Sequence, residues 1–220
     1  LNLTLRNLAD DRLALWTHLI RRSDSSYPEG EFSSAFARDL DQGYRGTIKG
    51  TKLFRNELYL TIVAHPGRDR ADAAVGFVSR LGQARRGGGE VDAAALKRLN
   101  DAARDITLGR YDARQLCLVE QDGILFSEPM RLLHLLASSE DLPTALPQGR
   151  IGSAVYTNRV IFGREAIEVR AAGGSLFAGM FGLKEYPAST KPGMLNGLLS
   201  APFEFVLSQS FAFLSKADAK

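Results

Sequence analysis

The sequence predicts an α+β fold: a mixed, largely antiparallel sheet with helices packed on it and a βαβ-type unit at the C-terminal end. Segments with the spacing of amphipathic helices alternate along the chain with short segments rich in β-branched and aromatic residues. Two pairs of these short segments are joined by turn sequences, Asp122-Gly123 and residues 171–174, that are typical of antiparallel hairpins. Helices mixed with hairpins indicate the α+β class.

The first elements expected are a strand, a loop and a helix. Residues 13–22 are apolar on both faces, which indicates a buried strand, with a short buried helix as the alternative. Ser, Pro and Gly predict a loop over 23–30. Apolar side chains recur every three or four residues over 32–44, so we expect a helix there, ending at Gly43 and Gly46.

A second strand and two more helices follow. Residues 56–66 indicate a strand that Pro66 stops. Helical spacing over 75–81 ends at Gly82, and it returns over 95–106.

Residues 114–127 form the predicted hairpin across Asp122-Gly123. A helix over 130–137 comes next, and Ser127 and Pro129 suit its start.

The best internal linker is the proline-containing segment 138–150. We therefore expect an N-terminal α/β portion over 1–137 and a β-rich portion over 151–220, with a single continuous domain as the alternative. In the second portion, a helix at roughly 192–200 is expected to lead into an alternating strand over 203–213, as a βαβ-type crossover.

Composition excludes few functions. Of the 220 residues, 45% are hydrophobic and 24% charged, which is ordinary for a globular protein. The net charge of +3 is too small to indicate nucleic-acid binding by itself. A local basic excess over 67–86 suits a solvated helix face and loop, or a contact with an anionic partner; it consists of Arg68, Arg70, Arg80, Arg85 and Arg86. The chain does not start with Met, so we expect it to be a piece of a longer protein.

Nucleotide and metal motifs are missing from the sequence. A phosphate loop needs Gly-x-x-x-x-Gly-Lys-Ser/Thr, but here the lysine comes one place late, in Gly182-Leu183-Lys184-Glu185. The histidines have no ligand-type spacing. We expect His18 and His134 to be core or boundary residues, His65 a loop residue and Cys117 a buried strand thiol.

No catalytic, cofactor-binding or metal-binding residue is assigned. The candidate carboxylates fall at polar positions of helices or hairpins, which predicts solvated faces; they are Glu31, Asp39, Asp101, Asp105, Glu165 and Glu168. The candidate stacking aromatics lack basic neighbours at the same spacing, which predicts core packing; they are Trp16, Phe203, Phe205, Phe211 and Phe213.

Several segments in order resemble the CagE/TrbE/VirB family, the large ATPases of type IV secretion and conjugation machines. The segments that show this resemblance are residues 13–32, 56–63, 157–170 and 177–220. The last of them contains Lys-Glu-Tyr-Pro, Pro-Gly-Met-Leu-Asn, Ala-Pro-Phe and Gln-Ser-Phe, in that order. The part that matches is the family's N-terminal domain.

The resemblance implies a protein at the cytoplasmic face of the bacterial inner membrane that assembles as an oligomer, often a hexamer. It implies that ATP and Mg bind in a RecA-like C-terminal domain downstream of Lys220, so no cofactor is expected in this part. The expected partners are inner-membrane and cytoplasmic subunits of the machine and further copies of the chain.

We therefore expect a non-catalytic docking and assembly domain of an ATPase that energises pilus assembly and transfer of DNA or protein. The basic segment 67–86 is a candidate contact for acidic partner segments or anionic lipid. One alternative is a nucleic-acid-binding module, which would show steeply salt-dependent binding. Another is a stand-alone enzyme with an unrecognised site, which would show a pocket with convergent polar groups.

Overall fold

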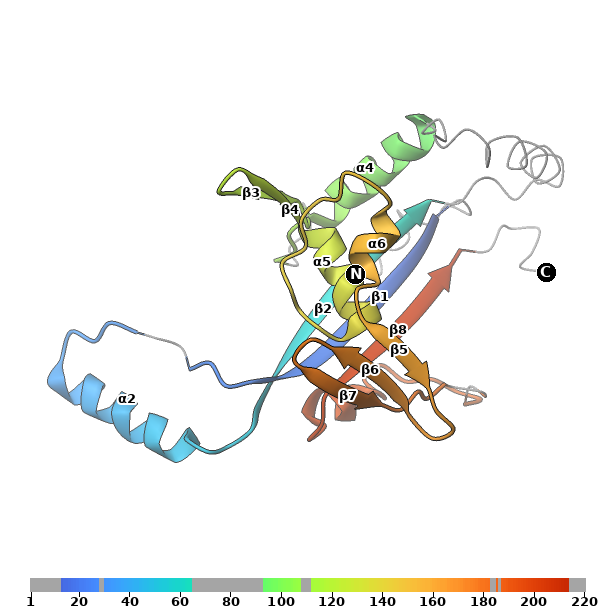
Figure 1. The fold of residues 1–220 in the computed structure, drawn as a ribbon. Helices are drawn as coiled ribbons and strands as arrows, with labels where there is room; N and C mark the ends of the chain where they lie inside the picture. The colour runs from blue at the N-terminus through green and yellow to red at the C-terminus, as the bar shows by residue number, and fades with distance from the viewer. Residues whose placement is uncertain are drawn as a thin grey trace, which may run out of the picture. The chain divides into compact units, whose positions relative to one another are not determined.

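The computed structural model describes residues 13–27, 30–64, 93–107, 112–182, 185 and 187–213. The chain forms two compact units, one from residues 1–109 and 191–220 and the other from 110–190. Helices and antiparallel sheets occur in both, so the predicted α+β class is confirmed (Figure 1).

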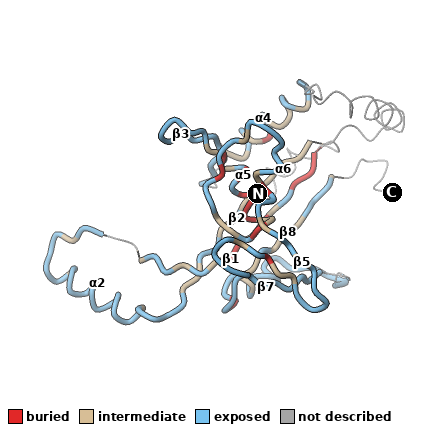
Figure 2. Tube along the Cα trace, viewed as in Figure 1, coloured by how far each residue is buried: buried red, intermediate tan, exposed pale blue. Residues whose placement is uncertain are grey.

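The first unit is organised by a three-stranded sheet in the order β2-β1-β8. The central strand β1 (Leu13–Asp24) pairs antiparallel with β2 (Leu53–Ala64) on one side and with β8 (Phe205–Ala212) on the other (Figure 1). A strand with two neighbours offers no free edge, and its apolar residues can be covered on both faces. Much of β1 is accordingly buried, which confirms the predicted strand (Figure 2).

Helix α4 (Ala93–Thr107) packs on this sheet, as its apolar spacing predicts. Buried Ala102 of α4 and buried Leu13 of β1 form one cluster. Partly buried hydrophobic residues surround them: Ile62, Ala64, Leu99, Ile106 and Phe213.

Helix α2 (Ala35–Ile48) begins where Ser34 accepts a hydrogen bond from the Ala37 backbone N–H. It continues through Gly43 and Gly46, so the predicted end of the helix is wrong. An interior glycine costs a helix only about 1 kcal/mol, which does not end it. None of the residues of α2 is buried.

A buried arginine fastens β1 to the segment that precedes β8. Arg21 is only 7% exposed, and its Nε and Nη1 donate to the carbonyl oxygens of Ala201 and Leu199, both at 2.7 Å. Nη1 also donates to Asn56 Oδ1 at 2.8 Å, and the guanidinium lies 4.5 Å from the Phe54 ring centroid. These acceptors compensate the loss of hydration of the cation.

The C-terminal crossover differs from the prediction. Residues 196–200 form a short 3₁₀ helix, η1 (Asn196–Ser200), rather than a helix over 192–200. Strand β8 then pairs antiparallel with β1, in a different sheet from β7 (Gly174–Ala178), so the predicted βαβ-type unit is wrong. The local sequence predicts strand β8 correctly, but its partner β1 lies about 190 positions earlier in the chain.

The second unit contains a hairpin and two helices. Strands β3 (Leu118–Gln121) and β4 (Ile124–Ser127) pair across Asp122 and Gly123, both with positive φ, as predicted. Helix α5 (Glu128–Ser138) follows, and Ser127 caps it by accepting from the Met130 backbone N–H. The short helix α6 (Ile151–Val155) was not predicted.

A second three-stranded antiparallel sheet completes this unit. Its order is β5 (Arg159–Phe162), β6 (Ile167–Ala171) and β7, and the predicted β6–β7 hairpin is confirmed.

The limits of the compact units differ from those of the predicted domains. The predicted linker 138–150 lies inside the second unit, where Ser127 N–H donates to Thr144 O at 2.9 Å and Leu146 N–H to Leu125 O at 2.7 Å. Residues 191–220 return to the first unit. The helix predicted over 75–81, His65 and the basic segment 67–86 lie outside the described residues.

Replacing the buried arginine tests its role in the first unit. Arg21→Met retains apolar bulk but removes the side-chain donor of the Ala201 carbonyl and one of the two donors of the Leu199 carbonyl, which still accepts from Asn56 Nδ2 at 3.0 Å. We therefore expect a loss of roughly 1–3 kcal/mol in the free energy of unfolding. Urea denaturation measures it. The matched control, Arg38→Met on the exposed surface of α2, should change stability by about 0.5 kcal/mol or less. Equal effects of the two variants would contradict the assigned role.

The pairing of β1 with β8 should also weaken in acid. Buried His18 lies next to Ser208 of β8, with Nδ1 and Oγ 2.8 Å apart, and burial lowers the pKa of its imidazole below the usual 6.5. The unfolded chain therefore binds a proton at a higher pH than the folded chain does. The stability contributed by neutral His18 is complete above about pH 6.5 and is lost as the pH falls through the folded-state value.

Thermal unfolding at about pH 7.5 and about pH 5.5 measures this effect. We expect His18→Gln to reduce the loss of melting temperature between the two pH values. The same loss in the wild type and the variant would show that His18 does not cause it.

Candidate functional site: an apolar groove between two helices

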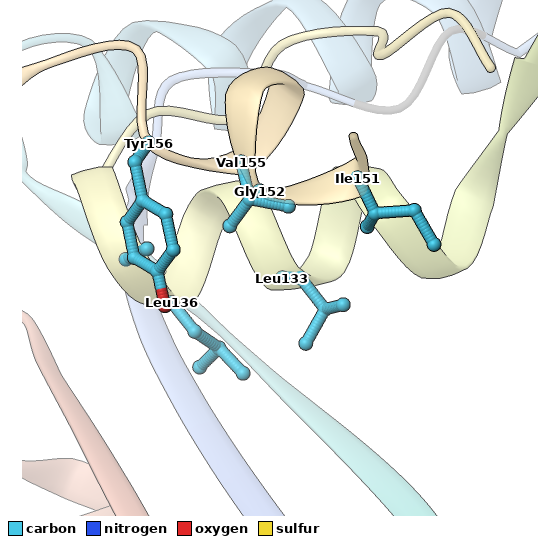
Figure 3. Close-up of a pocket in the computed structure, with 7 residues that line it drawn as sticks. Leu133, Leu136, Ile151, Gly152, Val155 and Tyr156 are labelled. Atoms are coloured by element: carbon cyan, nitrogen blue, oxygen red, sulfur yellow. The ribbon is translucent and has the colours of Figure 1, made fainter. Parts of the chain in front are cut away.

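The candidate site is an open groove between α5 and α6 in the second unit, with a volume of about 400 Å³. Figure 3 shows the Tyr156 ring extending from the α6 side towards Leu136 of α5. The lining contains no charged side chain and consists of Leu133, Leu136, Ala137, Ile151, Gly152, Val155 and Tyr156.

The groove exists because α5 is apolar on more than one face. One set of side chains is buried in the unit: Met130, Leu132, His134, Leu135 and Ser138. A second stripe, Leu133, Leu136 and Ala137, has the three- and four-residue spacing of one helix face. In α6, Ile151 and Val155 have the same four-residue spacing, so two short apolar stripes line one groove.

The outer part of the groove is accessible to solvent. Ile151 is 60% exposed, and Leu133 and Tyr156 are also exposed, whereas Val155 is buried. Burying one such side chain completely is worth about 1.5–3 kcal/mol. The groove can therefore bind an apolar segment, and the Tyr156 hydroxyl is the one polar side-chain group of its lining.

A buried histidine fixes the frame of the groove. His134 is 2% exposed, its Nδ1 lies 3.0 Å from the Glu140 carbonyl oxygen, and its Nε2 lies 2.7 Å from Thr157 Oγ1. Because the carbonyl can only accept, Nδ1 carries a proton and donates to it, and the threonine hydroxyl is the partner of Nε2. This arrangement confirms the predicted core histidine, and it holds the residue after Tyr156 against α5.

An ionised carboxylate fixes the start of α5. Glu128 accepts from the Arg114 guanidinium at 2.7 and 2.8 Å and from the Cys117 backbone N–H at 3.0 Å. The hydrogen bonds from Arg114 are the main reason that the pKa of Glu128 is lowered to about 2. A permanently ionised group at a helix N-terminus stabilises the helix and is unsuited to proton transfer at neutral pH.

The candidate carboxylates do not gather into one site. Five of the six are exposed, as predicted: Glu31, Asp39, Asp101, Asp105 and Glu165. Only Asp101 and Asp105 share an element, since they lie one turn apart on the exposed surface of α4. The sixth, Glu168, accepts from Arg170 and Ser175, and those hydrogen bonds lower its pKa. Within the described ranges, no three His, Cys, Asp or Glu side chains gather as metal ligands would.

Two predictions about burial are wrong. Cys117 is exposed just before β3, a strand whose four residues are all exposed as well. Trp16, Phe203 and Phe211 are also exposed, although core packing was expected. Alternation indicates which residues share a face of a sheet, but not whether another element covers that face.

Sequence reasoning missed the groove. The available signal was the excess of apolar residues over 130–137, which is more than one buried helix face requires. The second wall, α6, is five residues long and too short to show a helical period.

No helix within the described parts of the chain is long and apolar enough to cross a bilayer. The family model described as "Type IV secretion system ATPase VirB4/TrbE, N-terminal domain" matches residues 1–71. The model described as "CagE, TrbE, VirB family, component of type IV transporter system" matches residues 114–220. The chain belongs to this CagE/TrbE/VirB family, which confirms the resemblance found in the sequence.

Several curated relatives match along the whole chain. The type IV secretion system protein virB4 of Bartonella henselae is 43% identical over 221 residues, covering 100% of this chain and 28% of the relative. Protein virB4 of Agrobacterium fabrum is 35% identical, covering 99% of the chain and 28% of the relative. The corresponding Brucella suis protein is 31% identical, with 100% and 27% covered. The chain thus spans little more than a quarter of the length of these relatives.

Proposed function

We propose that this chain is a non-catalytic docking and assembly domain at the N-terminal end of a type IV secretion ATPase. The single observation that carries the proposal is the open groove between α5 and α6, whose lining is largely apolar and carries no charged side chain. The match to a family model for the N-terminal domain of such ATPases supports it. The relatives, named for type IV secretion, support the assignment to that machine.

In the whole protein, we propose that ATP and Mg bind beyond Lys220 and that hydrolysis there energises pilus assembly and transfer of DNA or protein. The protein would assemble as a hexamer at the cytoplasmic face of the inner membrane. The present domain would tie that motor to inner-membrane and cytoplasmic subunits of the machine.

The docking step follows from the physical properties of the groove. An apolar helix or extended segment of a machine subunit would cover Leu133, Ile151 and Tyr156, removing their exposed surface from water. The hydrogen bonds of His134 hold the groove in place before binding, so little ordering cost accompanies association. A rigid attachment of this kind can transmit movement of the motor to the bound subunit.

A charge in the groove tests the proposal. Ile151 is the first residue of α6, where an aspartate is compatible with the helix dipole, so Ile151→Asp should fold normally. We expect at least a tenfold loss of co-purification with the inner-membrane subunits of the machine, extracted in mild detergent from cells that express both. A tenfold loss corresponds to about 1.4 kcal/mol of binding free energy.

The matched control is Leu142→Asp, which charges an exposed leucine of the same unit outside the groove lining. It should leave co-purification unchanged, and circular dichroism should show both variants folded. Wild-type levels of bound subunits with Ile151→Asp would contradict docking through the groove. Tight DNA binding that falls by orders of magnitude between about 50 and about 200 mM salt would instead favour the nucleic-acid-binding alternative.

A further inference from the structure

Helix α2 carries an inference beyond the docking role, because one of its faces presents large apolar side chains to solvent. Phe36, Leu40 and Tyr44 are 77%, 64% and 60% exposed. They follow one another at four-residue spacing, so they form one stripe along the helix. Figure 2 shows the colour of exposed residues along most of α2.

The charged side chains of α2 lie away from this stripe. At about 100° per residue, Arg38 and Arg45 lie on the opposite side of the helix, and Asp39 and Asp41 lie between the two sides. The helix is therefore amphipathic, with an apolar stripe opposite a charged face.

Tyr27 covers the side of α2 that carries Asp41. Its hydroxyl donates to Asp41 Oδ1 at 2.8 Å, and the Arg45 guanidinium lies 4.5 Å from its ring centroid. Arg45 Nε also donates to Asp41 Oδ2 at 3.1 Å. These contacts occupy the charged side of the helix, so the stripe is the face that is open to a partner.

The stripe is small for a protein interface but suits a lipid surface. At about 150–250 Å² per aromatic side chain, Phe36 and Tyr44 expose roughly 300 Å², and Leu40 raises the total to roughly 400 Å². A standard protein interface buries about 800 Å² on each partner. A bilayer needs no matching surface, because apolar side chains of a helix insert into the boundary between headgroups and acyl chains.

The charge near the C-terminal end of α2 suits an anionic surface. Residues 42–56 contain four basic side chains and no acidic one. Arg45 and Arg55 form ion pairs within the chain, and Lys49 and Lys52 are exposed in the turn that follows the helix. Lysine side chains close to anionic headgroups strengthen binding to a membrane.

We propose that α2 binds the surface of an anionic lipid bilayer and lies in the plane of its interface. The three side chains of the stripe insert at the boundary between headgroups and acyl chains, and Lys49 and Lys52 contact lipid phosphates. The 14 residues of the helix are about 21 Å long, too short to span a hydrocarbon core of about 30 Å. Helices that lie on a membrane combine an apolar stripe with a charged opposite face in this way.

The lipid site goes beyond the proposed docking role, because it belongs to the other unit and binds a different kind of partner. It does not involve the groove, so either proposal can fail without the other. The groove variant Ile151→Asp should therefore bind lipid like the wild type.

Flotation of the 220-residue chain with mixed phosphatidylcholine–phosphatidylglycerol vesicles is the measurement. We expect the wild type to float and Leu40→Gln to bind about tenfold more weakly, because the leucine side chain no longer inserts. Glutamine is a good helix former, so circular dichroism should show the variant folded. The matched control is Leu96→Gln, at a 48% exposed leucine of α4, which should float like the wild type.

Two further measurements test the role of charge and the location of the contact. Binding to vesicles of phosphatidylcholine alone should be about tenfold weaker, and the double variant Lys49→Gln, Lys52→Gln should reduce this difference. Amide hydrogen exchange of the wild type with mixed vesicles should slow in peptides that cover residues 36–47, which belong to α2.

Four results would overturn the inference: a wild type that does not float, a Leu40→Gln variant that floats like the wild type, equal binding to both kinds of vesicle, or unchanged exchange in α2 when vesicles are bound. A wild type that does not float, and whose Leu40→Gln variant no longer co-purifies with the inner-membrane subunits, would assign the stripe to a protein instead.

Discussion

The first unit depends on the pairing of β1 on both of its sides. All twelve of its residues pair with β2, which follows after a helix, and eight of them, residues 14–21, also pair with β8, near the other end of the chain. An isolated hairpin of β1 and β2 would be only marginally stable in water, and the third strand changes that. Arg21 adds a second connection, because it binds two carbonyls of the segment just before β8. Both ends of the chain are therefore needed for one sheet.

Because β8 follows the second unit in the sequence and pairs with β1, the second unit interrupts the first. Residues 110–190 are inserted between the two parts of the first unit, and they fold around their own sheet and helix pair. The groove between α5 and α6 belongs to this inserted unit. The first unit thus supplies a three-stranded sheet built from both parts of the chain, and the second unit supplies the groove proposed for docking.

Turns, helix caps and helical periods could be predicted from the sequence. The long-range pairing of strands and the burial of side chains by other elements could not. The Asp122-Gly123 turn, the Ser127 cap and the α4 period each act over a few residues, and each is confirmed. The partner of β8 lies about 190 positions away, and no local pattern identifies it. Cys117 and Trp16 occur in apolar segments but are exposed, because their burial depends on elements that the sequence pattern does not specify. The groove was missed for the same reason, since one of its walls is a single short helix.

Amide hydrogen exchange tests the docking account most directly. It compares the chain alone with the chain bound to the inner-membrane subunits of its secretion machine. Docking through the groove should slow exchange in peptides that cover residues 133–137 and 151–156, which contain its lining, with little change in the β1 and β2 peptides of the other unit. Unchanged exchange in those two peptides, in a sample where the complex is fully formed, would contradict docking through this groove.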